Sequence, residues 1–314
     1  MHVGVDLGGT NIAAGLTDDE GNLVFKDSVA TGGRRPAEEI IKDLASLCAR
    51  VIKGGGCGEN DVKSVGIGSP GQVDGKNGVI YSSNNINFRN TDIKSEMGKY
   101  TGLPVFLEND ANTAAIAESV CGAAKGCKNS VMITLGTGIG GGVIIDGRIL
   151  QGAFFGGGDI GHHVIVSGGE ECTCGRRGCW EAYASATALI RDTKRAMKAH
   201  PESALWELAE DADAVTTKTT FDAADKGDET AVRLISDFLT YVAEGVVNMI
   251  YIFQPEIIVL GGGISAQGIK LTGPVESFVK GIREESFLKT KIAAAALGND
   301  AGIIGAAMLH SLQC

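Results

Sequence analysis

One pattern occurs twice in this sequence, with its two copies more than a hundred residues apart. In the first copy, over residues 3–22, an apolar strand leads into a turn of glycine and threonine, and a second strand leads into a turn of acidic residues and glycine. The second copy, over residues 131–147, has the same order of features. Such a repeat predicts two similar α/β lobes around a cleft, each with a glycine-rich loop.

The two glycine turns, Gly8–Thr10 and Gly136–Gly142, are suited to binding phosphate. Consecutive backbone N–H groups in such turns form concave anion sites, and glycine lets phosphate oxygens approach closely. Thr10 and Thr137 each add a hydroxyl donor. For a single loop, a tight hairpin without a ligand is an equal alternative. Two matched loops favour a nucleoside triphosphate.

Other nucleotide-binding motifs are either absent from the sequence or stand in the wrong structural context. The sequence contains no G-x-x-x-x-G-K-[ST], so a P-loop is excluded. Gly136, Gly138 and Gly141 match G-x-G-x-x-G, but in a dinucleotide-binding fold this loop opens a helix. Here the following residues are apolar and lead into Asp146-Gly147, which predicts a strand and a turn. A dehydrogenase is therefore disfavoured.

Acidic residues stand at the ends of two predicted strands. Asp6 lies just before the first glycine turn, separated from it by Leu7, and there its carboxylate could hold Mg²⁺, the ion that phosphoryl transfer requires. Asp110 follows a predicted strand and begins a predicted helix. An aspartate in that position is either the helix N-cap or a catalytic base, and the residues alone do not choose between them.

Three cysteines form the most specific local signal. Cys172, Cys174 and Cys179 lie within eight residues, separated by glycines, and Cys172 is ten residues after His162. Three thiolates and one imidazole make a closed tetrahedral zinc site with no open position, so we expect a structural Zn²⁺. The adjacent His163 is a rival fourth ligand. Three reduced loop thiols are the alternative.

Length and charge limit the remaining classes. A chain of 314 residues predicts two lobes, because single cores rarely grow beyond about 250–300 residues. A formal charge of −10 without a basic cluster disfavours nucleic acid and anionic membranes as partners. There is no signal-peptide pattern and no apolar run of about 18 residues. We expect a cytoplasmic protein whose other cysteines are reduced.

Four motifs resemble the ROK family of sugar kinases and repressors, specifically its bacterial glucokinases, and the resemblance covers nearly the whole chain. The motifs are Asp6–Asn11, Glu108–Asn112, Leu135–Gly142 and Cys172–Glu181. The resemblance implies a two-lobed actin/hexokinase-like (ribonuclease H-like) fold. We expect a smaller lobe of residues 1–115 plus 300–314 and a larger lobe of residues 116–299. The resemblance also implies ATP-dependent phosphorylation of the 6-hydroxyl of a hexose, with glucose as the expected sugar. It implies a homodimer or a homotetramer as the assembly.

The resemblance also implies residue roles, with Asp110 as the catalytic base. The implied sugar-binding residues are Gly68, Gly71, Asn84, Asn109, Asp110, Asp159, His162 and Glu181. The implied residues for ATP and Mg²⁺ are Asp6, Gly8, Gly9, Thr10, Asn11, Gly136, Thr137, Gly138, Gly261, Gly262 and Gly263.

One position departs from the family pattern. The family usually has Glu-x-Gly-His before the cysteines, whereas this chain has Asp159-Ile160-Gly161-His162, with a carboxylate one methylene shorter. This leaves open N-acetylmannosamine, N-acetylglucosamine or allose as the sugar, and polyphosphate as the donor. A sugar-sensing protein that does not bind DNA is a further alternative. ROK repressors carry a helix-turn-helix ahead of the kinase fold, and because this chain enters its first strand at His2, we favour an enzyme.

Overall fold

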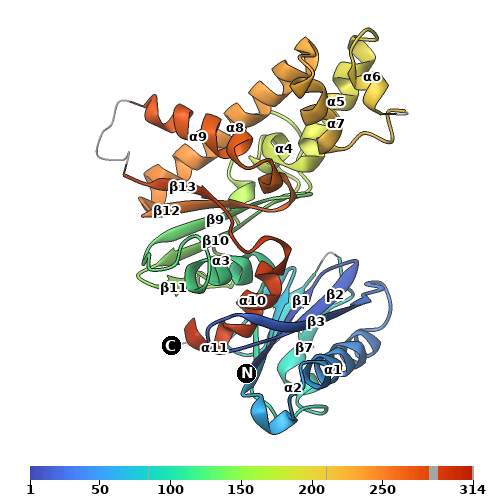
Figure 1. Cartoon of the computed structure of the whole chain (residues 1–314), viewed down its shortest axis with the longest axis vertical. Helices are drawn as coiled ribbons and strands as arrows, with labels where there is room; N and C mark the ends of the chain where they lie inside the picture. The colour runs from blue at the N-terminus through green and yellow to red at the C-terminus, as the bar shows by residue number, and fades with distance from the viewer. Residues whose placement is uncertain (84, 210, 283–288, 313–314) are drawn as a thin grey trace. The chain divides into compact units, whose positions relative to one another are not determined.

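The computed structural model describes residues 1–312 except 84, 210 and 283–288. The chain divides into two compact units, each of which has its own core (Figure 1). Unit 1 consists of Met1–Met132, Gly141–Gly158 and Ala295–Cys314, and unit 2 of Ile133–Gly140 and Asp159–Ala294. No helix in the described ranges is both long and apolar enough to cross a membrane.

The first of two five-stranded sheets has the strand order β3-β2-β1-β4-β8. Its strands are β1 (His2–Leu7), β2 (Asn11–Thr17), β3 (Leu23–Ala30), β4 (Ser64–Ser69) and β8 (Val105–Asn109). Strands β1 to β3 form an antiparallel meander, while β1, β4 and β8 run parallel. Because parallel strands end at the same edge, β1, β4 and β8 bring their last residues together.

The second five-stranded sheet has the strand order β11-β10-β9-β12-β13. Its strands are β9 (Ser130–Leu135), β10 (Ile139–Ile145), β11 (Arg148–Ile149), β12 (Ile257–Gly261) and β13 (Lys291–Ala294). Numbered along the chain, both sheets have the order third, second, first, fourth, fifth. The sequence repeat is therefore a repeat of structure, and the predicted α/β fold with a duplicated sheet is confirmed.

The remaining elements are short strands and helices. A three-stranded sheet contains β5 (Gln72–Asp74), β6 (Val79–Ser82) and β7 (Arg89–Asp92). The helices are α1 (Ala37–Gly54), α2 (Ile93–Met97), α3 (Asp110–Val120), α4 (Glu181–Ala184), α5 (Ala186–Ala199), α6 (Leu205–Leu208), α7 (Thr217–Asp225), α8 (Glu229–Phe253), α9 (Ile269–Lys280), α10 (Ala301–Ala307) and α11 (Leu309–Leu312).

Strand β1 is covered on both faces, and its alternation decides what each face meets. Val3, Val5 and Leu7 belong to the same core as the apolar face of α1, and all three are fully buried. Burying such a side chain contributes about 1.5–3 kcal/mol. The alternate residues Gly4 and Asp6 face α10. A side chain on Gly4 would overlap the α10 backbone, so glycine lets this helix lie directly on the strand.

One predicted boundary was wrong. The predicted turn 136–142 is shorter, because β10 begins at Ile139, and Gly142 lies inside that strand where α3 packs too closely for a side chain. Helices α4 and α5 are separate, because the Ser185 hydroxyl caps α5. Helix α7 begins at Thr217, and Thr216 caps it.

Candidate functional site

Two aspartates interact at the carboxyl edge of the first sheet. Asp6 lies at the end of β1, and Asp110 is the first residue of α3, directly after β8. Burial raises the pKa of Asp6 to about 6, and the negative charge of Asp110 adds to the rise. Among the described residues, the Asp6 carboxylate accepts no hydrogen bond. A carboxylate that is mostly buried without donors, next to a second carboxylate, fits a hard cation such as Mg²⁺.

Helix α10 packs directly against the side chain of Asp6. A Cβ built on Gly302 would lie 2.7 Å from Cγ and Oδ2 of Asp6. Since real Cβ atoms do not approach that closely, glycine at position 302 is what allows α10 to cover this carboxylate. The same close packing causes the burial that raises the pKa of Asp6.

Asn109, not Asp110, caps helix α3. The Asn109 Oδ1 accepts hydrogen bonds from the backbone N–H groups of Ala111 at 2.9 Å and Asn112 at 3.2 Å. The N-cap alternative for Asp110 is therefore wrong, because Asp110 is the first helical residue. The Nδ2 of Asn109 also donates to the carbonyl of Gly71 at 3.2 Å, which joins two predicted sugar-binding positions.

Glu108 is a buried residue to which the sequence assigned no role. Its Oε1 accepts from the Asn109 N–H at 2.8 Å and from Nδ2 of Asn112 at 3.0 Å, and its Oε2 accepts from Nε2 of Gln151. The register aligns Gly68 of β4 with Asp6 on one side and Glu108 on the other. Three donors thus hold the strand end that carries Asn109 and Asp110. In the sequence, the sign that could have revealed this residue is a charged side chain near the end of an apolar strand.

The first glycine turn lies at the same edge. The N–H of Gly8 donates to the carbonyl of Asn11 at 3.0 Å, and the Thr31 hydroxyl donates to the carbonyl of Gly8 at 2.6 Å. Thr10 and Asn11 are exposed. This turn therefore lies at the end of the β1–β2 hairpin, two residues after Asp6, with Thr10 at the surface.

The predicted zinc ligands form one cluster in unit 2. The ligand atoms of His162, Cys172, Cys174 and Cys179 all lie within 4.8 Å of one another. The Sγ atoms of Cys174 and Cys179 are 3.6 Å apart, and Cys172 Sγ is 3.4 Å from Nδ1 of His162. Tetrahedral bonds of about 2.0–2.3 Å require ligand atoms about 3.3–3.8 Å apart. The four residues therefore fit a zinc ion.

His162 is the histidine of this cluster. Nδ1 of His163 instead lies 2.5 Å from the carbonyl oxygen of Ile160, and its Nε2 lies 3.2 Å from Nδ2 of Asn248. Its ring also packs against Trp180, with the ring centroids 5.3 Å apart. Burial raises the pKa of the Cys179 thiol to about 12. A bound cation would offset that desolvation, since metal binding replaces the thiol proton.

Two carboxylates, those of Asp159 and Glu181, lie beside this cluster. Oδ2 of Asp159 lies 3.8 Å from Nε2 of His162, the ring nitrogen on the side away from Cys172. Glu181, the first residue of α4, accepts a hydrogen bond from the Ile139 N–H at 2.9 Å. Its carboxylate occupies the space that a side chain on Gly138 would need. Unit 2 therefore joins the zinc loop to the second glycine turn through Glu181.

The glycines at the end of β12 lie beside the same turn. Gly262 has a φ of 80°, and a Cβ on it would lie 2.5 Å from the carbonyl oxygen of Leu135. Leu135 ends β9 and directly precedes Gly136. The predicted ATP-binding residues Gly261–Gly263 and the second glycine turn are thus at one edge of the second sheet.

The family model that describes the ROK family matches residues 2–312. The chain belongs to the ROK family. The predicted resemblance is thereby confirmed over almost the full sequence. ROK membership does not by itself separate kinases from regulators, because both kinds of protein are among the relatives described next.

Three ROK relatives illustrate this range. The chain is 39% identical over 312 residues to a glucokinase of Thermotoga maritima, covering 98% of this chain and 96% of that one. It is 33% identical over 263 residues to a xylose repressor of Bacillus spizizenii, covering 83% of this chain and 64% of the repressor. A solved ROK family glucokinase from Streptomyces griseus, in complex with glucose and AMPPNP, has a TM-score of 0.83 at 37% identity over 98% of both chains.

The predicted ROK site residues fall into two groups, one in each unit. Unit 1 holds Asp6, Gly8, Gly9, Thr10, Asn11, Gly68, Gly71, Asn109 and Asp110. Unit 2 holds Gly136, Thr137, Gly138, Asp159, His162, Glu181, Gly261, Gly262 and Gly263, together with the three cysteines. The predicted Asn84 lies outside the described residues.

Proposed function

We propose that this protein is an ATP-dependent sugar kinase that phosphorylates the 6-hydroxyl of a hexose, with glucose as its preferred sugar. The observation that carries this proposal is the coupled pair of aspartates at one sheet edge, beside a glycine turn. Asp110 supplies a base, and Asp6 supplies a carboxylate for the cation that accompanies ATP. The similarity to glucokinases, one of them solved with glucose and AMPPNP, supports the same reaction.

In the proposed reaction, the sugar 6-oxygen attacks the γ-phosphorus as its proton moves to the Asp110 carboxylate. The bond from the γ-phosphorus to the bridging oxygen breaks, and ADP leaves. The N–H groups of the turns Gly8–Thr10 and Gly136–Gly138 hold phosphate oxygens. Mg²⁺, when bound, neutralises phosphate charge. A general base contributes about 10²–10⁴-fold to such a rate, so positioning and electrostatics supply the rest.

The sugar side of the proposal rests on four predicted residues, Asn109, Asp159, His162 and Glu181. The zinc cluster uses Nδ1 of His162, which leaves Nε2 for a sugar hydroxyl. Asp159 lies on that side of the imidazole, and Glu181 begins the adjoining helix. Because Zn²⁺ would fix the loop that carries His162, it orders this group without taking part in phosphoryl transfer.

A sugar-sensing role is the second candidate function, and the similarity to the xylose repressor favours it. Another hexose or an N-acetylhexosamine as substrate, and polyphosphate as donor, are variants of the kinase proposal. The cytoplasmic location, a homodimer or homotetramer, and the predicted lobe boundaries stay predictions.

A coupled assay of ADP release across glucose, mannose, allose, N-acetylglucosamine and N-acetylmannosamine tests the kinase proposal. The highest kcat/KM with glucose supports it in full. Preference for an N-acetylhexosamine overturns the glucose assignment and keeps the kinase. Sugar binding by calorimetry without turnover on any sugar, with ATP or with polyphosphate, overturns the kinase in favour of the sensor.

A further inference from the structure

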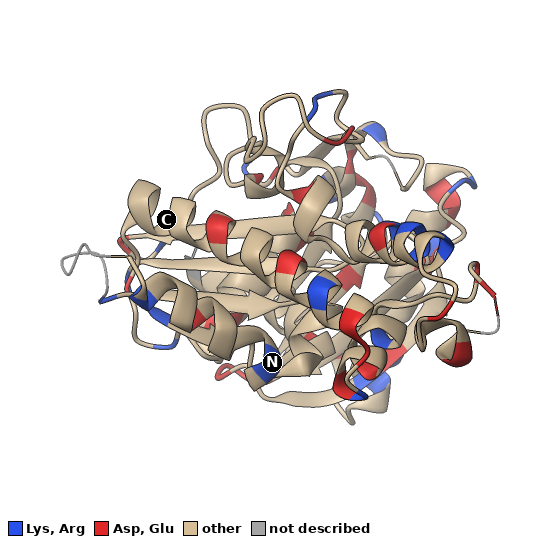
Figure 2. Ribbon diagram, turned by 90° about the horizontal axis from the view of Figure 1, so that it is seen from above, with Lys and Arg blue, Asp and Glu red and all other residues tan. Residues whose placement is uncertain are grey.

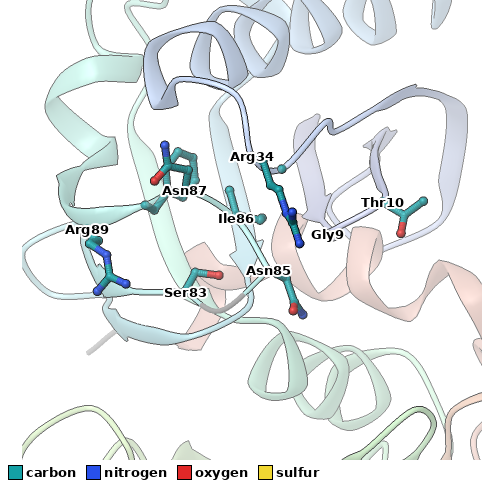
Figure 3. A pocket seen from close by; sticks show the side chains of 10 residues that line it. Gly9, Thr10, Arg34, Ser83, Asn85, Ile86, Asn87 and Arg89 are labelled. Atoms are coloured by element: carbon teal, nitrogen blue, oxygen red, sulfur yellow. The ribbon is translucent and has the colours of Figure 1, made fainter.

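Unit 1 contains a cavity of about 670 Å³ beside the first glycine turn (Figure 3). Its lining residues are Gly9, Thr10, Gly33, Arg34, Ser83, Asn85, Ile86, Asn87, Phe88 and Arg89. Basic and acidic residues are otherwise interspersed along the ribbon, and the formal charge of the chain is −10 (Figure 2). Yet the described residues of this lining include two arginines and no acidic residue, so the cavity favours an anion.

The two arginines are not used by the fold. Within the described residues, neither guanidinium of Arg34 and Arg89 has an ion pair or a hydrogen bond. The neighbouring Arg35 shows the contrast, because it pairs with Asp43 at 2.5 Å and donates to the carbonyl of Thr31 at 2.8 Å. A guanidinium with free donors binds phosphate oxygens in a bidentate manner.

Ser83 gives an independent sign of a ligand. It is only 9% exposed, and its side chain lines the cavity. Among the described residues, its Oγ has no hydrogen-bond partner. Buried hydroxyl groups without a partner are rare and costly in native structures. An oxygen atom of a bound ligand would satisfy this hydroxyl, so it indicates a ligand with acceptor oxygens.

We propose that this cavity binds the phosphate group of a small phosphorylated molecule, through two arginines and a serine that the proposed nucleotide site does not use. Arg34 and Arg89 neutralise the dianion, and the Ser83 hydroxyl donates to one of its oxygens. Gly9 and Thr10 form part of the wall, so the site adjoins the proposed transfer site. Inorganic polyphosphate and a sugar phosphate both present this chemistry. The proposal goes beyond the kinase function and does not depend on it.

Calorimetry on the full chain tests the two sources separately, with tripolyphosphate and glucose 6-phosphate as probes and AMPPNP as the nucleotide control. In the double variant Arg34→Gln/Arg89→Gln, we expect Kd for at least one probe to rise about 30-fold or more, since charged hydrogen bonds carry such losses. Arg148→Gln removes an exposed arginine of the same unit and should change each Kd by less than about threefold.

Each other result overturns the proposal. Wild-type protein that binds neither probe at millimolar concentration has no such site. Equal weakening by Arg148→Gln shows unspecific attraction by net charge. If AMPPNP is weakened as much as the probes, the arginines belong to the nucleotide site.

Ser83→Ala provides a second test with two readouts. We expect probe binding to weaken about threefold or more, because a hydrogen bond to phosphate is lost. The melting temperature of the unliganded protein should stay the same or rise, because an unsatisfied buried hydroxyl has been removed. A lower melting temperature together with unchanged probe binding would mean that the hydroxyl is structural, and the proposal would be wrong.

Discussion

The two copies of the repeat of strand, glycine turn and strand have the same backbone arrangement, but the carboxylates beside their turns differ. In each copy a strand ends at a leucine, Leu7 or Leu135, and the next strand begins after three intervening residues. The residue before that leucine is Asp6 in the first copy and Thr134 in the second. The carboxylate beside the second turn is that of Glu181, which comes from α4 rather than from the hairpin.

These carboxylates also differ in their partners. Asp6 accepts no hydrogen bond from the described residues, and burial next to Asp110 raises its pKa to about 6. Glu181 accepts a hydrogen bond from the Ile139 N–H and lies 3.4 Å from the Thr173 hydroxyl. The first carboxylate therefore lacks a counter-charge, whereas the second is already used to hold two loops together. Symmetry of the sheets does not extend to the chemistry of the sites.

The largest effect should come from Asp110 in unit 1. Asp110→Asn keeps the shape of the side chain and removes the proton acceptor, so kcat should fall about 10²–10⁴-fold. Sugar binding, measured by calorimetry, should persist. Glu181→Gln is the counterpart in unit 2 and should mainly raise KM. An Asp110→Asn enzyme with more than about a tenth of the wild-type kcat would remove the catalytic distinction between the units.

Most of the fold and the metal site could be predicted from local sequence patterns. The duplicated order of strands and turns depends on apolar periodicity over short windows, so residues 3–22 and 131–147 predicted both hairpins. The zinc ligands were predictable because three of the four lie within eight residues, and their spacing alone suits one metal. The choice between His162 and His163 needed the structure, because two adjacent side chains point in different directions.

What the sequence could not reveal depends on contacts between distant segments. Gln151 reaches Glu108 across 43 positions, and Gly302 covers Asp6 from the far end of the chain. The cap of α3 was also missed, because Asn109 and Asp110 are both good capping residues and only the backbone geometry decides between them. Gly142 resembled a turn residue because close packing on α3 leaves no trace in the local sequence.

The second prediction concerns the metal cluster of unit 2. Cys174→Ala removes one of four ligands, so the purified protein should lose its zinc, measured as one ion per wild-type chain by elemental analysis. The KM for sugar should rise about tenfold or more, because the loop with His162 is no longer fixed. Cys57→Ala removes a thiol outside the cluster and should change neither quantity. Zinc-free wild-type protein with full activity would contradict the metal assignment.

The third prediction tests the shortened carboxylate of unit 2. Asp159→Ala should raise the KM for glucose about tenfold or more, because a hydrogen bond to a charged group is worth about 1.5–3 kcal/mol. Asp159→Glu restores the family residue and should keep substantial activity. KM and kcat for glucose, N-acetylglucosamine and N-acetylmannosamine on all three proteins provide the check. If Asp159→Ala matches the wild type on every sugar, Asp159 does not contact the substrate.

The smallest effect concerns the melting temperature, which should rise when the charge of Asp6 is removed and fall when the charge of Glu181 is removed. The pKa of Asp6 is raised from 3.8 to about 6 in the folded protein. Between these values the folded state binds more protons than the unfolded state, so the free energy of unfolding decreases as pH rises through this window. At pH 7.5 without Mg²⁺, the ionised Asp6 therefore destabilises the fold, by roughly 1–3 kcal/mol after allowance for its partial exposure.

Asp6→Asn should accordingly raise the melting temperature by a few degrees at pH 7.5, and by less at pH 5, where most of the wild-type Asp6 is protonated. Glu181→Gln should lower the melting temperature at pH 7.5, because the Ile139 N–H loses a charged acceptor. Added Mg²⁺ and ATP should stabilise the wild type and not Asp6→Asn, since a ligand stabilises only the state that binds it. Thermal melts of the three proteins at both pH values measure these differences. Two variants that shift the melting temperature in the same direction would show that the two carboxylates are equivalent, and the contrast between the hairpins would then be one of position alone.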